Sequence, residues 1–247
     1  MAYDYLQAAF DGVPLTSFGM ILTGQAASEG APRTSLVDVP GRDGFSDATA
    51  RPGGWPSLSP MSMTLTLVHE AAGEDVVTAD VLALRSSVAG RRVRYEPWDA
   101  PRGWWLDCVC TAVSLTSRSA RRAEVEVSLA CDPAYHGRTV TQSLADGTAL
   151  AATVGGNRPT WPTLALTASA AGRVSAAERM GGGSVTSAAS LAAGAALAIN
   201  MGARAMTVGG SRAAVTLASD WWRLAPGEAS VLVTNAAGTI EWDERWA

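Results

Sequence analysis

The chain has 247 residues, 47% of them hydrophobic and 17% charged, and this balance describes a folded globular protein rather than a disordered one. The formal net charge of −4 argues against general nucleic-acid binding, which needs a basic surface that releases counterions. No apolar run approaches the ~20 residues of a membrane helix. The start, "MAYDYLQAAFDG", lacks the basic and apolar regions of a signal peptide. We therefore expect a protein without a membrane partner, made in a cytoplasm.

The first distinctive stretch is "VDVPGRDGFSDATARPGG", from Val37 to Gly54, which is rich in aspartate, arginine and glycine. Its acids lack the alternating spacing and closing glutamate of an EF-hand calcium loop. The chain has no lysine, which a Walker-type phosphate loop requires. Asp and Gly in "GRDG" favour a tight turn. The sequence therefore predicts an ordered, exposed loop whose role is contact.

The next two segments have clear periodicities. "MSMTLTLVHE", Met61 to Glu70, alternates apolar and polar residues and predicts a strand. The following segment predicts a helix near 75–89, capped by Asp75 and ended by Gly90 in the left-handed conformation. Its apolar residues recur at spacings of four, three and four, and are Val77, Val81, Leu84 and Val88.

Two more alternating segments, "WWLDCVCTAVSLTS" and "RRAEVEVSLACD", predict a hairpin. A turn near Ser119 places Cys108 opposite the neighbourhood of Cys131. Three cysteines without a signal peptide indicate reduced thiols, and these two are interpreted as small buried hydrophobic residues. Because the cysteine and histidine spacing matches no structural zinc pattern, we predict no metal site.

The second half begins after the glycine- and proline-rich "VGGNRPTWPTLAL", which predicts two domains, 1–154 and 155–247. Just before it, the pair Asp146-Gly147 predicts a tight hairpin. Beyond it, many short strands separated by glycines predict an antiparallel sandwich. The expected fold class is mainly β: a β-rich N-terminal domain with one α-helix, followed by a β-sandwich.

Catalytic patterns are weak along the chain. There is no G-x-S-x-G motif, and neither histidine lies near a cysteine or an orienting acid in the sequence. Asp220, beside Trp221 and Trp222, is the best local candidate for a glycan-cleaving carboxylate. The same tryptophans are a candidate aromatic contact surface for sugars, although a strand would bury one ring and expose the other. Nine tryptophans also suit the cores of protein interfaces.

The order of features along the chain resembles that of the distal tail protein of long-tailed, siphovirus-type bacteriophages. The resemblance begins with "FDGVPLTSFGMILTG" and "VDVPGRDG" and continues through the helix flanked by strands and the "CVCTAVSL"/"AEVEVSLACDP" hairpin. After the proline-rich joint it includes "LAINMGARAMTVGG", "WWRLAPGEASVLV" and "GTIEWDERW". It covers nearly the whole chain.

This resemblance implies a structural, non-enzymatic virion protein of the phage tail tip, assembled in the bacterial cytoplasm, with no cofactor. The first half would form a homohexameric ring that joins the tail tube protein to the tail-tip hub. The second half would be a galectin-like sandwich that docks receptor-binding or other peripheral proteins. A carbohydrate-binding, lectin-like protein is the alternative, and a glycan-degrading enzyme is a third interpretation.

Only some residues carry over from the family pattern. Leu224, Pro226 and Gly227 match its turn before a late strand, with Ala229 where the family has an asparagine. Arg245 and Trp246 match its usual ending. No segment is long enough for an inserted sugar-binding module, which argues against direct recognition of host sugars. The expected ring or tail contacts are Val39, Pro40, Gly41, Arg42, Asp43 and Gly44.

Overall fold

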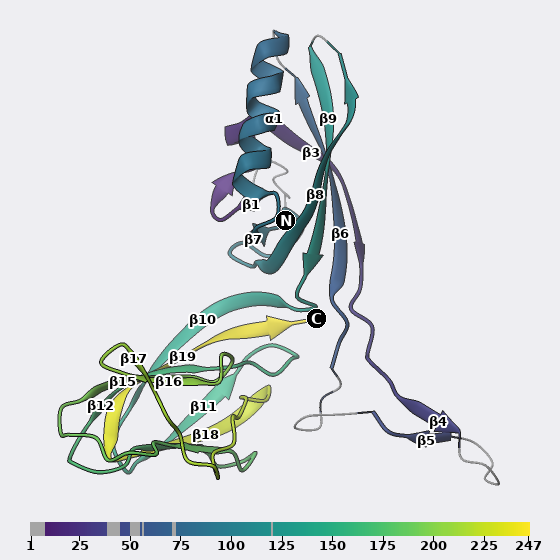
Figure 1. Cartoon of the computed structure of the whole chain (residues 1–247). Coiled ribbons are helices and arrows are strands. Elements are labelled where there is room, and N and C mark those ends of the chain that lie inside the picture. The colour runs from purple at the N-terminus through teal and green to yellow at the C-terminus, as the bar shows by residue number, and fades with distance from the viewer. Residues whose placement is uncertain (1–7, 39–44, 50–54, 56, 71–72, 120) are drawn as a thin grey trace. The chain divides into compact units, whose positions relative to one another are not determined.

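The chain packs as two units, Met1–His136 and Gly137–Ala247, and both are built mainly of antiparallel strands (Figure 1). The predicted fold class is confirmed, including one α-helix in the described part of the first unit. Among the described residues, no helix has the length and apolar character needed to cross a membrane. The computed structural model describes residues 8–38, 45–49, 55, 57–70, 73–119 and 121–247.

The first unit is built on a seven-stranded sheet with the order β2-β1-β7-β8-β9-β6-β3. A 3₁₀ turn, Leu15–Phe18, leads into β3. The predicted strand Met61–Glu70 is confirmed as β6, and its alternating Met and Leu side chains are buried. The other strands are β1 Ala9–Phe10, β2 Val13–Pro14, β3 Met20–Ser28, β7 Arg92–Glu96, β8 Leu106–Arg118 and β9 Arg122–Cys131.

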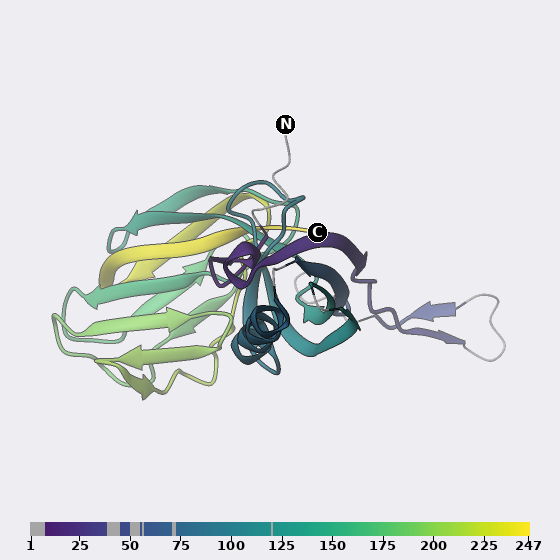
Figure 2. The same ribbon diagram turned by 90° about the horizontal axis from the view of Figure 1, so that it is seen from above.

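The helix α1, Glu74–Val88, covers one face of this sheet and is seen end-on in Figure 2. Its buried residues are the four that the periodicity predicts. The cap differs from the prediction, because the helix begins one residue before Asp75 and its N-cap is Gly73, which has no side chain to offer. Gly90 lies just beyond the last turn with φ of 69°, so the predicted left-handed ending is confirmed.

A buried polar pair joins α1 to the sheet. His69 on β6 is 2% exposed, and its Nε2 lies 2.7 Å from Oδ2 of Asp80 on α1. Since a carboxylate only accepts, the imidazole N–H donates this hydrogen bond. Gly19, in the left-handed region at φ of 64°, lies so close to the His69 ring that a Cβ there would overlap it. Helix, sheet and 3₁₀ turn therefore meet at one histidine.

Replacing Asp80 with alanine removes the partner of His69 Nε2 and leaves this buried donor unsatisfied. We expect a loss of about 1–3 kcal/mol in the free energy of unfolding, measured by urea denaturation. Asp75→Ala, in the exposed first turn of the same helix, is the matched control and should cost less than about 1 kcal/mol. Equal losses in the two variants would contradict a special role for the pair.

The predicted hairpin is confirmed as β8 and β9, and Cys108 pairs directly with Cys131 in its register. The prediction of reduced thiols is wrong for two of the three cysteines. Cys108 and Cys131 form a disulfide, and Cys110 is the free thiol. The sequence argument placed these two cysteines opposite each other, but it treated the odd cysteine count as a sign of reduced thiols and interpreted the pair as buried hydrophobic residues. Burial raises the pKa of the Cys110 thiol, which disfavours the thiolate that disulfide exchange requires.

Reducing the Cys108–Cys131 disulfide should lower stability by about 3 kcal/mol, since a cross-link over 23 residues restricts the unfolded chain. The measurement is the urea midpoint with and without a reducing agent. Cys110→Ala should keep the full response, whereas the double variant Cys108→Ala/Cys131→Ala should show none. A wild-type urea midpoint that is the same with and without the reducing agent would contradict this expectation.

The second unit is a sandwich of two antiparallel sheets that share one core, with the orders β10-β19-β12-β15-β16-β17 and β11-β18-β13-β14. The strands of the larger sheet are β10 Tyr135–Leu144, β12 Thr163–Ala168, β15 Ala196–Asn200, β16 Ala205–Val208, β17 Ser211–Ala213 and β19 Ala236–Trp246. Those of the smaller sheet are β11 Ala149–Val154, β13 Ser175–Glu178, β14 Ser184–Thr186 and β18 Gly227–Thr234.

The units divide between His136 and Gly137, earlier than the predicted boundary at 155, because β10 and β11 belong to the sandwich. The predicted hairpin at Asp146-Gly147 is wrong. The turn exists, with φ of 67° at Gly147, but it carries the chain from one sheet to the other. Asp146 Oδ1 accepts a 2.7 Å hydrogen bond from the Asn235 N–H, which fixes this crossing. Asp-Gly specifies a turn, and long-range pairing decides which strands flank it.

The glycine- and proline-rich segment lies inside the second unit. The N–H groups of Asn157 and Arg158 both donate to the Arg245 carbonyl, at 2.9 and 3.1 Å. Gly156 has φ of 97°, and a Cβ there would collide with the Arg245 backbone. The segment is therefore an ordered connection that pairs with the end of β19.

Candidate interaction surfaces

Two strands of the first unit leave its main sheet and form an arm. β4, Leu36–Asp38, pairs with β5, Phe45–Asp47, in a separate two-stranded sheet beyond the ends of β3 and β6 (Figures 1 and 2). Backbone hydrogen bonds also join the segment that precedes β4 to the segment that follows β5. These run from Ser59 N–H to Ala31 O, from Arg33 N–H to Ser57 O and from Ala48 N–H to Ser35 O. The arm, residues 31–59, therefore prolongs the β3–β6 ladder as a ribbon.

The arm exposes apolar side chains. Leu36 is 52% exposed and Val37 is 48% exposed. An isolated two-stranded hairpin is at best marginally stable in water, so a ribbon of this kind gains stability when something covers it. The six predicted contact residues, Val39 to Gly44, follow β4 in the sequence and lie outside the described residues.

The first unit has a second apolar surface beside α1. Leu82 of the helix is 55% exposed and Leu115 of β8 is 40% exposed. Next to them is a hollow of about 170 Å³ with an arginine at two of its edges. An apolar cavity of ~150 Å³ accepts a group the size of benzene, so this hollow suits one aliphatic side chain. Its lining consists of Val77, Thr78, Val81, Leu82, Arg85, Leu115 and Arg118.

In the second unit the structure separates the two adjacent tryptophans. Trp222 is 5% exposed, packs over Gly183 and donates from Nε1 to the Ala176 carbonyl at 3.2 Å. Trp221 is half-buried against the edge of the same core. Trp222 is thus a core residue and unsuited to an aromatic contact surface, while Trp221 keeps part of its ring accessible. Asp220 is exposed beside them.

The residues carried over from the family pattern lie in the core and strands of the second unit. Leu224 is fully buried and pairs with Thr160, and Gly227 begins β18 with φ of 99°. Ala229, which stands in place of the expected asparagine, is buried in β18. Arg245 and Trp246 end β19, where Trp246 packs against Gly137. The matched turn and ending therefore serve the sandwich itself.

The larger sheet of the second unit carries a shallow hollow of about 550 Å³. Sugar-binding sites combine an aromatic or apolar wall with convergent polar groups. The residues that line this hollow are small or aliphatic, with threonine the most polar among them: Ala165, Leu166, Thr167, Ala196, Leu197, Ala198, Thr207, Gly209 and Gly210. This lining gives a saccharide little to stack on.

Replacing each tryptophan with alanine distinguishes core from surface. Trp222→Ala should cost about 3–5 kcal/mol of stability, because it empties a packed site and strands the Ala176 carbonyl. Trp221→Ala should cost less, about 1 kcal/mol, since its side chain is only partly buried. Urea denaturation of both variants measures this, and equal losses would show that the two rings do not differ in this way.

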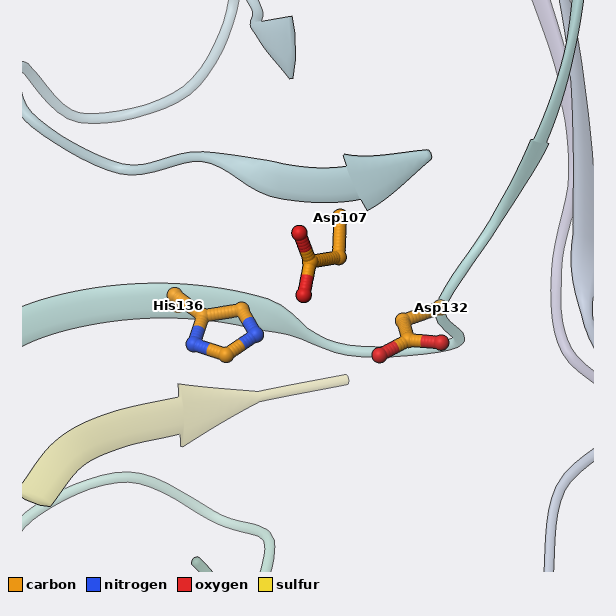
Figure 3. A group of neighbouring side chains, drawn as sticks. All are labelled: Asp107, Asp132 and His136. Atoms are coloured by element: carbon orange, nitrogen blue, oxygen red, sulfur yellow. The ribbon is translucent and has the colours of Figure 1, made fainter. Parts of the chain in front are cut away.

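One cluster of side chains has the chemistry of metal ligands. Asp107 on β8, Asp132 after β9 and His136 on β10 each offer a ligand atom, and these atoms all lie within 4.8 Å of one another. Figure 3 shows both carboxylates directed toward the imidazole ring. The sequence prediction missed this cluster, because its members are up to 29 positions apart. The β8–β9 hairpin and the bridge between Trp105 and His136 bring them together.

Comparison with known proteins shows similarity to components of phage tails. Residues 155–246 match the model of the family described as siphovirus-type tail component, C-terminal domain. No curated protein sequence matches the chain at a significant level. The crystal structure of SPP1 Dit, a paradigm of the hub adsorption apparatus in phages that infect Gram-positive bacteria, matches with a TM-score of 0.76. The match covers 98% of this chain and 99% of that chain, at 16% identity.

More distant similarity extends to chains of the phage p2 baseplate in its activated conformation. The strontium form gives a TM-score of 0.49 at 8% identity, over 93% of this chain and 91% of that chain. The calcium form gives 0.47 at 7% identity, over 95% and 92%.

Residues 155–246, which lie within the second unit, are therefore similar to the C-terminal domain of siphovirus-type tail components. The fold of the whole chain is that of SPP1 Dit. These similarities confirm the resemblance in the sequence: part of the second unit is similar to the C-terminal domain of siphovirus-type tail components, and the whole chain has the fold of a phage Dit protein.

Proposed function

We propose that six copies of this chain form a closed ring that connects the tail tube to the tail-tip hub. The first unit makes the ring, and the second unit carries peripheral tail-tip proteins such as a receptor-binding protein. The role is structural rather than enzymatic. Support for this role comes from the family of the second unit and from the fold of the whole chain.

The observation that carries the proposal is the arm. A cyclic ring uses head-to-tail contacts, in which one patch of a subunit meets a different patch of the next. The first unit offers two such patches, the exposed Leu36–Val37 pair of the arm and the apolar surface at Leu82 and Leu115. An aliphatic side chain from the arm suits the hollow beside α1 in size and polarity.

The charge of the chain agrees with a passage for DNA. A ring through which DNA moves should not hold it, and a net charge of −4 disfavours binding to phosphates. The lectin-like alternative receives less support, because Trp222 lies in the core and the hollow on the larger sheet has an aliphatic lining.

The test is the mass of the purified protein by light scattering, alone and with the tail tube protein of the same phage. Wild type should form a species near six times the 25.5 kDa monomer. The double variant Leu36→Asp/Val37→Asp should remain monomeric, because two charges would have to enter an apolar contact. Leu82→Asp should weaken assembly in the same way.

Met180→Asp is the matched control for this test. Met180 is 64% exposed in the second unit, so its substitution adds a charge at an apolar surface residue outside the proposed ring contact. This variant should assemble like wild type. If the arm variant still forms the six-subunit species, the proposed contact is wrong. If wild type stays monomeric in the presence of the tube protein, the proposed ring is wrong.

A further inference from the structure

We propose that Asp107, Asp132 and His136 form a binding site for one divalent transition-metal ion, with Zn²⁺ as the best fit. Two carboxylates and one imidazole are ligands that zinc accepts. Their ligand atoms lie within 4.8 Å of one another, whereas two ligands of a tetrahedral zinc are about 3.4 Å apart. Small side-chain rotations close this difference. The inference is independent of the proposed ring.

The backbone holds the three residues in place. The Asp132 N–H donates to the Asp107 carbonyl at 2.7 Å, next to the Cys108–Cys131 disulfide. His136 and Trp105 exchange two backbone hydrogen bonds of 2.8 and 3.0 Å. The cluster therefore sits on a paired segment, and such preorganisation lowers the entropy lost on binding.

The imidazole ring is also oriented from its other side. Trp105 stacks on His136 with ring centroids 3.8 Å apart and an interplanar angle of 12°. A metal-binding histidine must present a ring nitrogen in a fixed direction, and neighbouring groups normally supply that orientation. Here an indole plane packs against the ring, and Figure 3 shows both carboxylates directed toward it.

Arg94 is the cross-strand neighbour of Asp107. Its guanidinium lies 4.4 Å from the Trp105 ring centroid, and its Nε is 3.4 Å from Glu96. Within the described part of the chain, Asp107 itself forms no side-chain hydrogen bond or ion pair. Two carboxylates held close together repel each other, and a dication relieves that repulsion.

The position of the site gives it a structural role. All three ligands belong to the first unit, and His136 is its last residue. A bound ion would fasten residues 132–136 to β8 at the point where the chain leaves this unit. Three protein ligands leave one tetrahedral position for water or for a ligand from another molecule.

The experiment uses the full chain after removal of any affinity tag. Zinc is titrated by calorimetry and followed by NMR of the histidine ring nitrogens. The chain has only two histidines, so the buried His69 is an internal reference. We expect one equivalent of zinc, a shift of the His136 resonances and none of His69. Mn²⁺ should selectively broaden the His136 signals.

Asp107→Asn and Asp132→Asn keep the side-chain shape and should weaken zinc binding at least about tenfold. Asp220→Asn, which removes a charge from an exposed loop of the second unit, should bind like wild type. Circular dichroism would check that each variant is folded. His136→Gln gives a second test of the same site if an aspartate variant fails to fold.

Three outcomes would overturn the proposal. The first is the lack of saturable binding, and the second is binding that Asp107→Asn leaves unchanged. The third is a shift of both histidines together, which would indicate an adventitious ion only.

Discussion

The antiparallel ladder between β3 and β6 is the interaction on which the architecture of the first unit depends. Within the sheet it aligns Met20, Leu22, Met63, Leu65 and Leu67, whose side chains are buried in the core that α1 covers. Beyond the sheet, the segments that continue β3 and precede β6 stay hydrogen-bonded to each other and form the arm. The same pair of strands therefore contributes to the core and sets the direction in which exposed apolar residues leave it.

The second unit is organised around β19, which pairs with both β10 and β12 and whose last residues receive the connection at Asn157 and Arg158. The first strand of the unit, β10, therefore pairs with its last strand, β19. The site at Asp107, Asp132 and His136 would add a fastening at the end of the first unit, before β10 enters this sandwich.

Local patterns predicted α1 and β6 because a helix face and a strand face repeat within a few residues. The hairpin at Asp146-Gly147 failed, since a turn motif does not specify which sheet receives each strand. The hairpin prediction placed Cys108 opposite Cys131, but the sequence does not specify whether such a pair is oxidised. The metal-ligand cluster also needs the bridge between Trp105 and His136, which no short window contains. For the interaction surfaces, the sequence predicted a contact loop from Val37 to Gly54, most of which lies outside the described residues. It did not predict Leu36 or the patch beside α1, because exposure is a property of the folded chain.

Electron cryomicroscopy of the purified protein, with the tail tube protein added if the chain alone stays monomeric, would test the central claim most directly. The account predicts sixfold class averages in which density for each arm lies on the α1 side of the neighbouring subunit, with Leu36 and Val37 covered. Closed rings in which the arm touches only its own subunit would contradict the proposed contact. Particles without rotational symmetry under both conditions would contradict the ring itself.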